Sequence, residues 1–194
     1  LPFRFPVQWV NRPNLDFRGF SGTVASGAIA CGDRVVVAGS GVGSTVARIL
    51  GPDGDIARAG AGEAVTICLA DEVDVARGDM LAPIADRPAV ADQFAAHVLW
   101  MDEEALLPGR QYLLRMGHAW TAASVTAIKH RVDVTSLEHQ AATKLSLNEI
   151  AFCNLATARP LAFDPYATNR QTGAFILVDR YTNRTAGCGM VAFP

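Results

Sequence analysis

The sequence has little charge, and neither sign is in marked excess. Only 19% of the 194 residues are charged, and 17 Lys and Arg residues stand against 19 Asp and Glu residues, which gives a formal net charge of −2. Residues 1–90 carry 8 basic and 10 acidic groups, and residues 91–194 carry 9 of each. Proteins that bind nucleic acids need clustered positive charge to neutralise phosphates, so this composition argues against a nucleic-acid partner.

Long apolar runs are also absent. No stretch approaches the roughly 20 apolar residues that a membrane-spanning helix requires, so we expect no contact with a membrane. Half of the residues are nevertheless apolar, and a chain of this length can bury about 70% of its unfolded surface. The sequence therefore predicts a folded core.

Cysteines are few, and their spacing is not that of a zinc site. They lie far apart, with no C-x-x-C pair and no Cys–His spacing of the kind that binds zinc. Each lies in or beside an apolar run, which predicts that Cys31, Cys68, Cys153 and Cys188 are buried free thiols. Free thiols are typical of a reducing compartment, so we expect a cytoplasmic protein.

Helical periodicity is missing as well, since no stretch of the first half keeps a helical repeat beyond two turns. Short β-branched runs such as residues 64–69 alternate instead with Gly, Pro and Asp turns. Strands spaced by about 8–12 residues are typical of sandwiches and barrels. The pattern lapses around residues 85–92. The sequence predicts an all-β protein of two consecutive antiparallel β-barrels, residues 1–86 and 87–194, with at most one helical turn within residues 135–144.

One stretch is similar to a phosphate-binding loop but lacks the residues that such a loop needs. Residues 35–45 place glycines after a β-branched run, yet Ala38 stands where a P-loop has its first glycine and Ser44 where it has its lysine. That lysine reaches the β- and γ-phosphates, so we expect a glycine-rich hairpin without a GTP site. No H-E-x-x-H or G-x-S-x-G motif occurs. The sequence predicts no catalytic residue, no cofactor-binding residue and no metal ligand in this chain.

Two polar stretches, residues 11–19 and 164–173, combine arginine, asparagine and aromatic residues. Arginine and aromatic side chains are favoured at protein interfaces, although loops of a barrel are normally just solvated. We predict that these loops contact another domain or subunit through Arg12, Asp16, Arg18, Asn169 and Arg170. For Asp16 the alternative is that it only fixes its own turn through a side-chain bond to the backbone.

Motifs in these stretches and along the rest of the chain carry a resemblance to a known family. In the first half they are Phe5-Pro6-Val7-Gln8, Val10 to Asn14, Asp16 to Gly19, and Arg77-Gly78-Asp79. In the second half they include Pro108-Gly109-Arg110, Leu147 to Ile150, Asn169-Arg170 and Thr172-Gly173. In order and over nearly the whole chain, they resemble the GTPase (large) subunit of bacterial sulfate adenylyltransferase. The sequence departs from that family at residues 41–43, where a Ser-Gly-Lys type of turn is expected, and at Cys188, where alanine is expected.

The resemblance implies two barrels like domains 2 and 3 of translation elongation factor GTPases, following a GTPase domain. The parent subunit couples GTP hydrolysis to the formation of adenylylsulfate from ATP and sulfate, and some members are fused to an adenylylsulfate kinase. GTP and magnesium would bind before Leu1, a kinase would follow Pro194, and ATP would bind the small catalytic subunit or that kinase. This chain, which begins with Leu rather than Met, is then expected to be an inactive docking fragment. Its partners would be the small catalytic subunit and its own upstream GTPase domain.

Two other functions are compatible with a pair of barrels. An RNA-binding module of a translation-factor-like GTPase would bind tRNA in a gel shift that weakens steeply with salt, and the balanced charge speaks against it. A flavin-binding barrel of an oxidoreductase would purify as a yellow protein, and only the strand spacing supports it.

Overall fold

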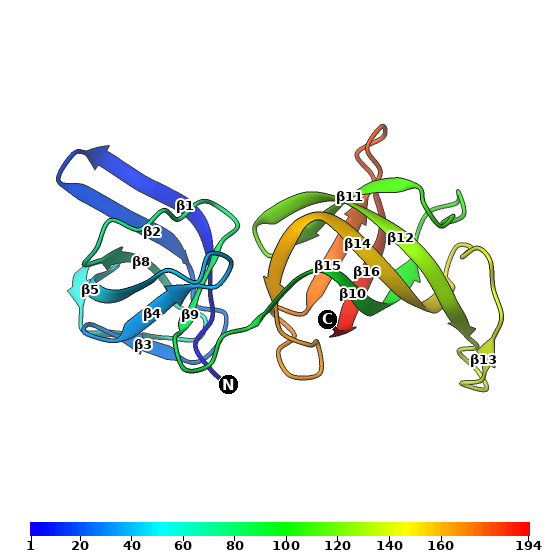
Figure 1. Cartoon of the computed structure of the whole chain (residues 1–194), viewed down its shortest axis with the longest axis horizontal. Helices are drawn as coiled ribbons and strands as arrows, with labels where there is room; N and C mark the ends of the chain where they lie inside the picture. The colour runs from blue at the N-terminus through cyan, green and yellow to red at the C-terminus, as the bar shows by residue number, and fades with distance from the viewer. The chain divides into compact units, whose positions relative to one another are not determined.

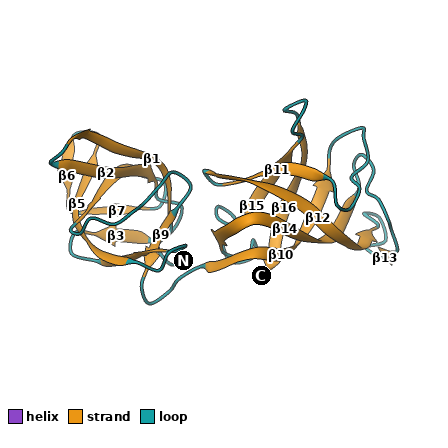
Figure 2. Cartoon of the chain, turned by 45° about the horizontal axis from the view of Figure 1, so that its top comes forward, coloured by secondary structure: helices purple, strands orange, loops and turns teal.

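The computed structural model describes residues 1–194 and contains strands but no helix (Figure 1, Figure 2). The chain divides into two compact units, Leu1–Ala89 and Val90–Pro194. The strands of each unit pair in antiparallel fashion. The all-β prediction is confirmed. Residues 135–144, which were expected to hold at most one helical turn, contain no helix, and His139–Gln140 form a short strand that pairs with the strand before them.

The first unit contains nine strands, six of which close into a barrel. The barrel follows the order β4-β9-β1-β2-β8-β5 and closes because β5 also pairs with β4, while β6 adds to β5 and β3 pairs with β7. The strands are β1 (Phe5–Asn14), β2 (Phe17–Thr23), β3 (Ala28–Ala30), β4 (Arg34–Val37), β5 (Gly43–Gly51), β6 (Gly54–Ile56), β7 (Arg58–Gly60), β8 (Ala64–Leu69) and β9 (Met80–Pro83).

Alternation along strands such as β1 builds much of the core of this barrel. In β1, Phe5 and Val7 are fully buried while Gln8 is exposed, because successive side chains point to opposite faces. The glycine-rich stretch that is similar to a phosphate loop connects β4 to β5, with Val36 paired to Gly43. Gly41 takes a φ of 76° in that turn, a conformation that glycine adopts without strain. The predicted hairpin is confirmed, and a strand rather than a helix follows the glycines.

The second unit repeats the same architecture with other strands. Its barrel follows the order β11-β15-β16-β10-β14-β12 and closes because β12 also pairs with β11, while β13 adds to β12. Closure leaves no free sheet edge in the barrel wall. The strands are β10 (Ala89–Trp100), β11 (Gln111–Met116), β12 (Ala119–Val132), β13 (His139–Gln140), β14 (Ile150–Phe163), β15 (Ala174–Val178) and β16 (Thr185–Phe193).

Aromatic rings fill the interior of the second barrel. Phe94 lies edge-on to Phe175, with ring centroids 5.7 Å apart, and Trp100 packs edge-on against Tyr112 at 5.4 Å. Two inward positions of β16, Gly187 and Gly189, are glycines and make room for these rings. A Cβ on Gly189 would lie 2.0 Å from Cζ of Phe175. Ring size and glycine placement are therefore matched across neighbouring strands.

On the outside of this barrel, aromatic rings line up across neighbouring strands. His97 packs on Phe152 with centroids 4.9 Å apart, Phe152 packs on His130 at 5.6 Å, and His130 stacks on His139 at 3.7 Å. Burial lowers the pKa of His130, and the nearby His139 and His97 lower it further. Two positively charged rings at this distance would repel each other, so the stack favours the neutral form of His130.

We therefore expect His130 to protonate below the ordinary histidine pKa of about 6.5. Because the pKa of His130 is lower in the folded state, its contribution to stability is fully present above the unfolded-state pKa of about 6.5. That contribution is lost as the pH falls through the lower folded-state pKa. A pH titration of the histidine ring protons by NMR measures this directly. His139→Asn should raise the pKa of His130, and an unchanged titration in that variant would contradict the assignment.

The prediction that all four cysteines are buried is wrong for Cys31. Cys31 is exposed in the turn before β4, Cys188 is half-buried, and Cys68 and Cys153 are buried. The apolar residues around Cys31 lie in strands, while Cys31 itself lies in the turn beside Gly32, and sequence neighbours do not distinguish these positions. Burial raises the pKa of the Cys68 and Cys188 thiols and raises that of Cys153 to about 12.

This order of exposure predicts an order of thiol reactivity. Only the thiolate reacts, so a buried thiol with a raised pKa is inert in the native state. With a maleimide at neutral pH, Cys31 should react first, Cys188 more slowly, and Cys68 and Cys153 only after unfolding. Peptide mass spectrometry of a timed reaction measures the order, and early alkylation of Cys153 would contradict the packing of β14.

Candidate functional site

The first predicted contact loop, residues 11–18, is the end of a hairpin rather than a loop. Its residues belong to β1 and β2, and only Leu15 and Asp16 form the turn, as the blue hairpin in Figure 1 shows. The backbone N–H of Asp16 donates to Oδ1 of Asn14 at 3.0 Å, so Asn14 and not Asp16 fixes the turn through its side chain. Asp16 is exposed, and Leu15 beside it has 88% of its surface exposed.

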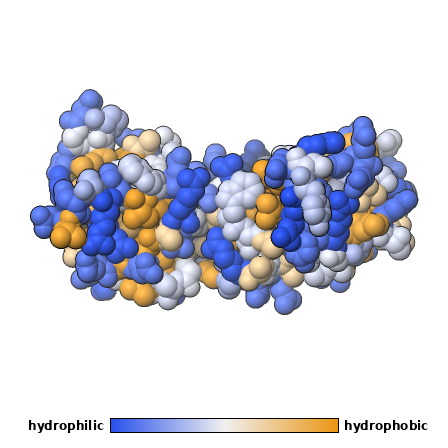
Figure 3. All heavy atoms as spheres, turned by 90° about the horizontal axis from the view of Figure 1, so that it is seen from above, coloured by the Kyte–Doolittle hydropathy of each residue, from blue (hydrophilic) through white to orange (hydrophobic).

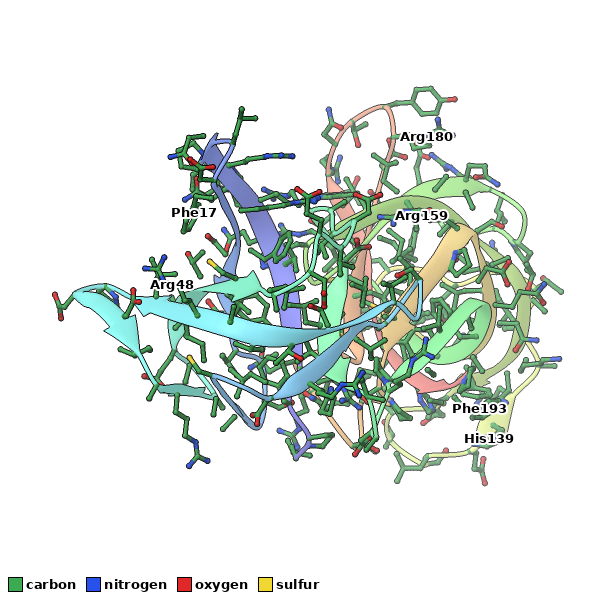
Figure 4. All side chains as sticks on the ribbon, turned by 60° about the vertical axis from the view of Figure 1, so that its left-hand side comes forward. Phe17, Arg48, His139, Arg159, Arg180 and Phe193 are labelled. Atoms are coloured by element: carbon green, nitrogen blue, oxygen red, sulfur yellow. The ribbon has the colours of Figure 1, made fainter.

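The structure brings Arg12, Asp16 and Arg18 together around one pocket of about 230 Å³, which we call the hairpin pocket. Phe17 of the hairpin and Arg48 of β5 line it as well (Figure 4). Its lining carries both signs of charge, because Asp71 and Glu72 face these arginines. Sequence reasoning missed this acidic side of the pocket, since residues 71 and 72 follow β8, far along the chain from the hairpin.

Long ion pairs hold the two predicted arginines of the hairpin. Nη2 of Arg12 lies 3.9 Å from Oε1 of Glu72, and Nη2 of Arg18 lies 3.7 Å from Oδ1 of Asp74. Arg18 also stacks over the ring of Phe20 at 5.6 Å, and its Nε is buried without a hydrogen-bond partner. Exposed ion pairs of this length contribute little to stability. Both guanidinium groups can therefore exchange these partners for a carboxylate of another chain.

The second predicted loop, residues 164–173, is a rigid connection between β14 and β15. Asn169 is 3% exposed, and its Oδ1 accepts a hydrogen bond from the backbone N–H of Gln171 at 3.1 Å. Thr172 donates its hydroxyl to Oδ2 of Asp164 at 2.7 Å, and both side chains are buried. Asn169 therefore serves its own loop. Arg170 is exposed and stacks over the ring of Tyr166 at 5.8 Å.

Tyr166 also lines a feature that sequence reasoning missed. A groove of about 570 Å³ lies on the outside of the second barrel, lined mainly by Leu99, Ile150, Ile176, Cys188 and Met190, with Arg115 as its one charged residue. We call it the apolar groove. The continuous apolar run of β15 was the available signal, because a strand with one solvated face normally alternates. Apolar patches also interrupt the polar surface of both units on the face shown in Figure 3.

The structure shows no group of three or more His, Cys, Asp or Glu side chains placed to hold a metal ion. It contains no helix long and apolar enough to cross a lipid bilayer. The hairpin pocket and the apolar groove are the two candidate functional surfaces.

A family model described as GTP-eEF1A C-terminal domain-like matches residues 93–192, which is more than half of the chain. The chain belongs to the GTP-eEF1A C-terminal domain-like family. The matched residues cover the second barrel, including the apolar groove and the loop of Asn169 and Arg170.

Several curated proteins match this chain over nearly the whole length of the chain. It is 60% identical to the bifunctional enzyme NodQ of Rhizobium sp. (strain N33) over 98% of this chain and 30% of that protein. It is 54% identical to the bifunctional enzyme CysN/CysC of Xylella fastidiosa over 95% of this chain and 30% of that protein. It is 50% identical to sulfate adenylyltransferase subunit 1 of Aeromonas hydrophila over 98% of this chain and 40% of that protein. The chain therefore spans less than half the length of these relatives, and the predicted family is confirmed.

Solved structures show the same fold at low sequence identity. The crystal structure of sup35 complexed with GDP has a TM-score of 0.89 at 18% identity, covering 99% of this chain and 47% of that one. The sup35 structure with GMPPNP gives a TM-score of 0.87. These likenesses confirm two barrels of the elongation-factor type.

Proposed function

We propose that this chain is the two-barrel docking part of the GTP-hydrolysing regulatory subunit of sulfate adenylyltransferase. The observation that carries the proposal is the 50% identity to subunit 1 of that enzyme over 98% of the chain. In this proposal the barrels hold the small catalytic subunit and the upstream GTPase domain, while the parent makes adenylylsulfate from ATP and sulfate with GTP hydrolysis. The chain has no turnover of its own.

The nucleotides bind elsewhere in the proposed assembly. GTP and magnesium belong to the upstream GTPase domain, and ATP belongs to the small catalytic subunit or to a fused kinase. The hairpin between β4 and β5 supports this assignment, since Ala38 and Ser44 replace the residues that a phosphate loop needs and no helix N-terminus faces the turn. Calorimetry of the chain with GTP and magnesium should show no micromolar binding.

Arginine variants test the docking role. Arg18→Ala and Arg170→Ala should each weaken binding of the chain to the small catalytic subunit or to the upstream GTPase domain by about tenfold or more, because a buried interface arginine contributes about 2 kcal/mol. Titration calorimetry measures the affinity. Arg58→Ala is the matched control, since Arg58 is exposed on β7 and lies in neither candidate surface.

Three outcomes are informative. If the wild-type chain does not bind the small subunit, the docking proposal is wrong. If it binds and both variants bind equally well, docking stands but the assignment of these arginines fails. Strong, salt-sensitive binding of tRNA by the same preparation would favour the RNA-binding alternative instead.

A further inference from the structure

The lining of the apolar groove comes from four neighbouring strands of the second barrel. Cys188 of β16 pairs with Ile176 of β15 on one side and with Leu99 of β10 on the other. Ile150 starts β14, the next strand beyond β10. All four are half-buried, while the residues before and after Cys188, Gly187 and Gly189, are buried inside the barrel. The four side chains therefore form one row on the outer face.

A second row extends this apolar surface. Met190 pairs with His97 on β10 and with Ala174 on β15, and His97 packs on Phe152 of β14. The outward face of an antiparallel sheet is ordinarily polar when it faces water. An apolar area that spans adjacent strands is instead typical of an interaction surface.

The charges at the edge of the groove are positive and lack acidic partners. Arg115 stacks over Trp120 at 5.5 Å and donates from Nε to the backbone oxygen of Gly117. Arg170 stacks over Tyr166, which lines the groove. Neither guanidinium is paired with a carboxylate, and no acidic residue lines the groove. In the hairpin pocket, by contrast, Arg12 and Arg18 already face acids.

We propose that the apolar groove is the docking site for a segment of the small catalytic subunit that inserts aliphatic side chains and presents a carboxylate to Arg115 or Arg170. This inference rests on the proposed function and assigns that contact to one face of one barrel. Arginine held flat on an aromatic ring keeps its donors free for bidentate binding of a carboxylate. The row of Leu99, Ile150, Ile176 and Met190 supplies the apolar contact that buries the segment.

Cys188 provides a direct readout, because it lies in the groove and is half-buried. Cys31 provides an internal control, because it is exposed on the other unit. We expect a saturating amount of the small catalytic subunit to slow maleimide alkylation of Cys188 in the full chain by about tenfold, with Cys31 unchanged. Peptide mass spectrometry follows both thiols in the same sample.

A charge placed in the groove tests the same contact without a label. Met190→Glu should weaken binding of the small catalytic subunit by about tenfold or more, because the new carboxylate would be buried against apolar side chains. Val134→Glu is the matched control, since Val134 is 67% exposed in the turn after β12 and does not line the groove. Circular dichroism verifies that both variants are folded.

Each result decides between the two proposals. Protection of Cys188 together with loss of binding in Met190→Glu supports the groove. Binding of the small subunit without protection of Cys188, and with Met190→Glu binding normally, overturns the groove and leaves the docking function in place. Failure of the wild-type chain to bind the small subunit overturns both.

Discussion

Replacing Gly189 with alanine should lower the unfolding temperature of the second unit by about 10 °C. The new Cβ would lie 2.0 Å from Cζ of Phe175 and 2.5 Å from its Cε1 and Cε2 atoms, much closer than any real contact. Phe175 is 3% exposed and packs against Phe94, so its ring has no free space to enter. Overpacking of this kind destabilises a core by about 1–3 kcal/mol, and each kcal/mol shifts the midpoint by about 4–8 °C in a unit of this size.

Two variants control this measurement, which uses thermal unfolding and hydrogen exchange of peptides from each unit. Gly39→Ala should leave stability nearly unchanged, because no atom lies within 4 Å of the position that the new Cβ would take, and the φ of Gly39 is not in the left-handed region. Phe175→Leu should partly rescue Gly189→Ala, since the two residues face each other across β15 and β16. An unfolding temperature equal to that of the wild type in Gly189→Ala would show that the ring is not held as described.

Replacing Arg4 with alanine should destabilise the first unit by about 3 kcal/mol. Arg4 is 1% exposed, and its Nη1 donates to the backbone oxygens of Phe3 at 3.0 Å and Asp86 at 2.8 Å. Its Nη2 donates to Oδ1 of Asp86 at 3.3 Å. The side chain therefore joins the start of the first strand to the end of the unit, and its removal leaves the buried backbone oxygen of Phe3 without this donor.

Arg48→Ala is the control for this variant, because it removes an arginine of the same chemistry from the surface. Arg48 donates to both carboxylate oxygens of Asp55, at 3.0 and 2.8 Å, but both side chains are more than half exposed. Water replaces such a bond, so stability should hardly change. Urea unfolding and hydrogen exchange of residues 1–89 compare the two variants. If Arg4→Ala and Arg48→Ala have the same free energy of unfolding, the buried side chain of Arg4 does not stabilise the first unit.

The sequence by itself determined the fold class, the absence of a phosphate loop and the family. The fold class and the missing phosphate loop depend on local patterns, namely alternating strands with turn residues between them, and Ala38 and Ser44 in place of a glycine and a lysine. Each such pattern acts within a few residues of the chain, so it can be interpreted before any packing is known. The family follows from the resemblance of motifs along the whole chain. The motifs at residues 11–19 and 164–173 also contain Arg12 and Arg18 of the hairpin pocket and Arg170 at the edge of the groove.

Only the tertiary structure decided which of these residues are free to bind. Asn169 and Arg170 are neighbours in sequence, yet one is buried in its own loop and the other lies on Tyr166 beside the groove. Asp71 and Glu72 reach the hairpin pocket only because β8 pairs with β2. The apolar groove is formed by the register of four strands that are distant in sequence. Barrel closure fixes that register and decides which apolar side chains fill the core and which remain outside.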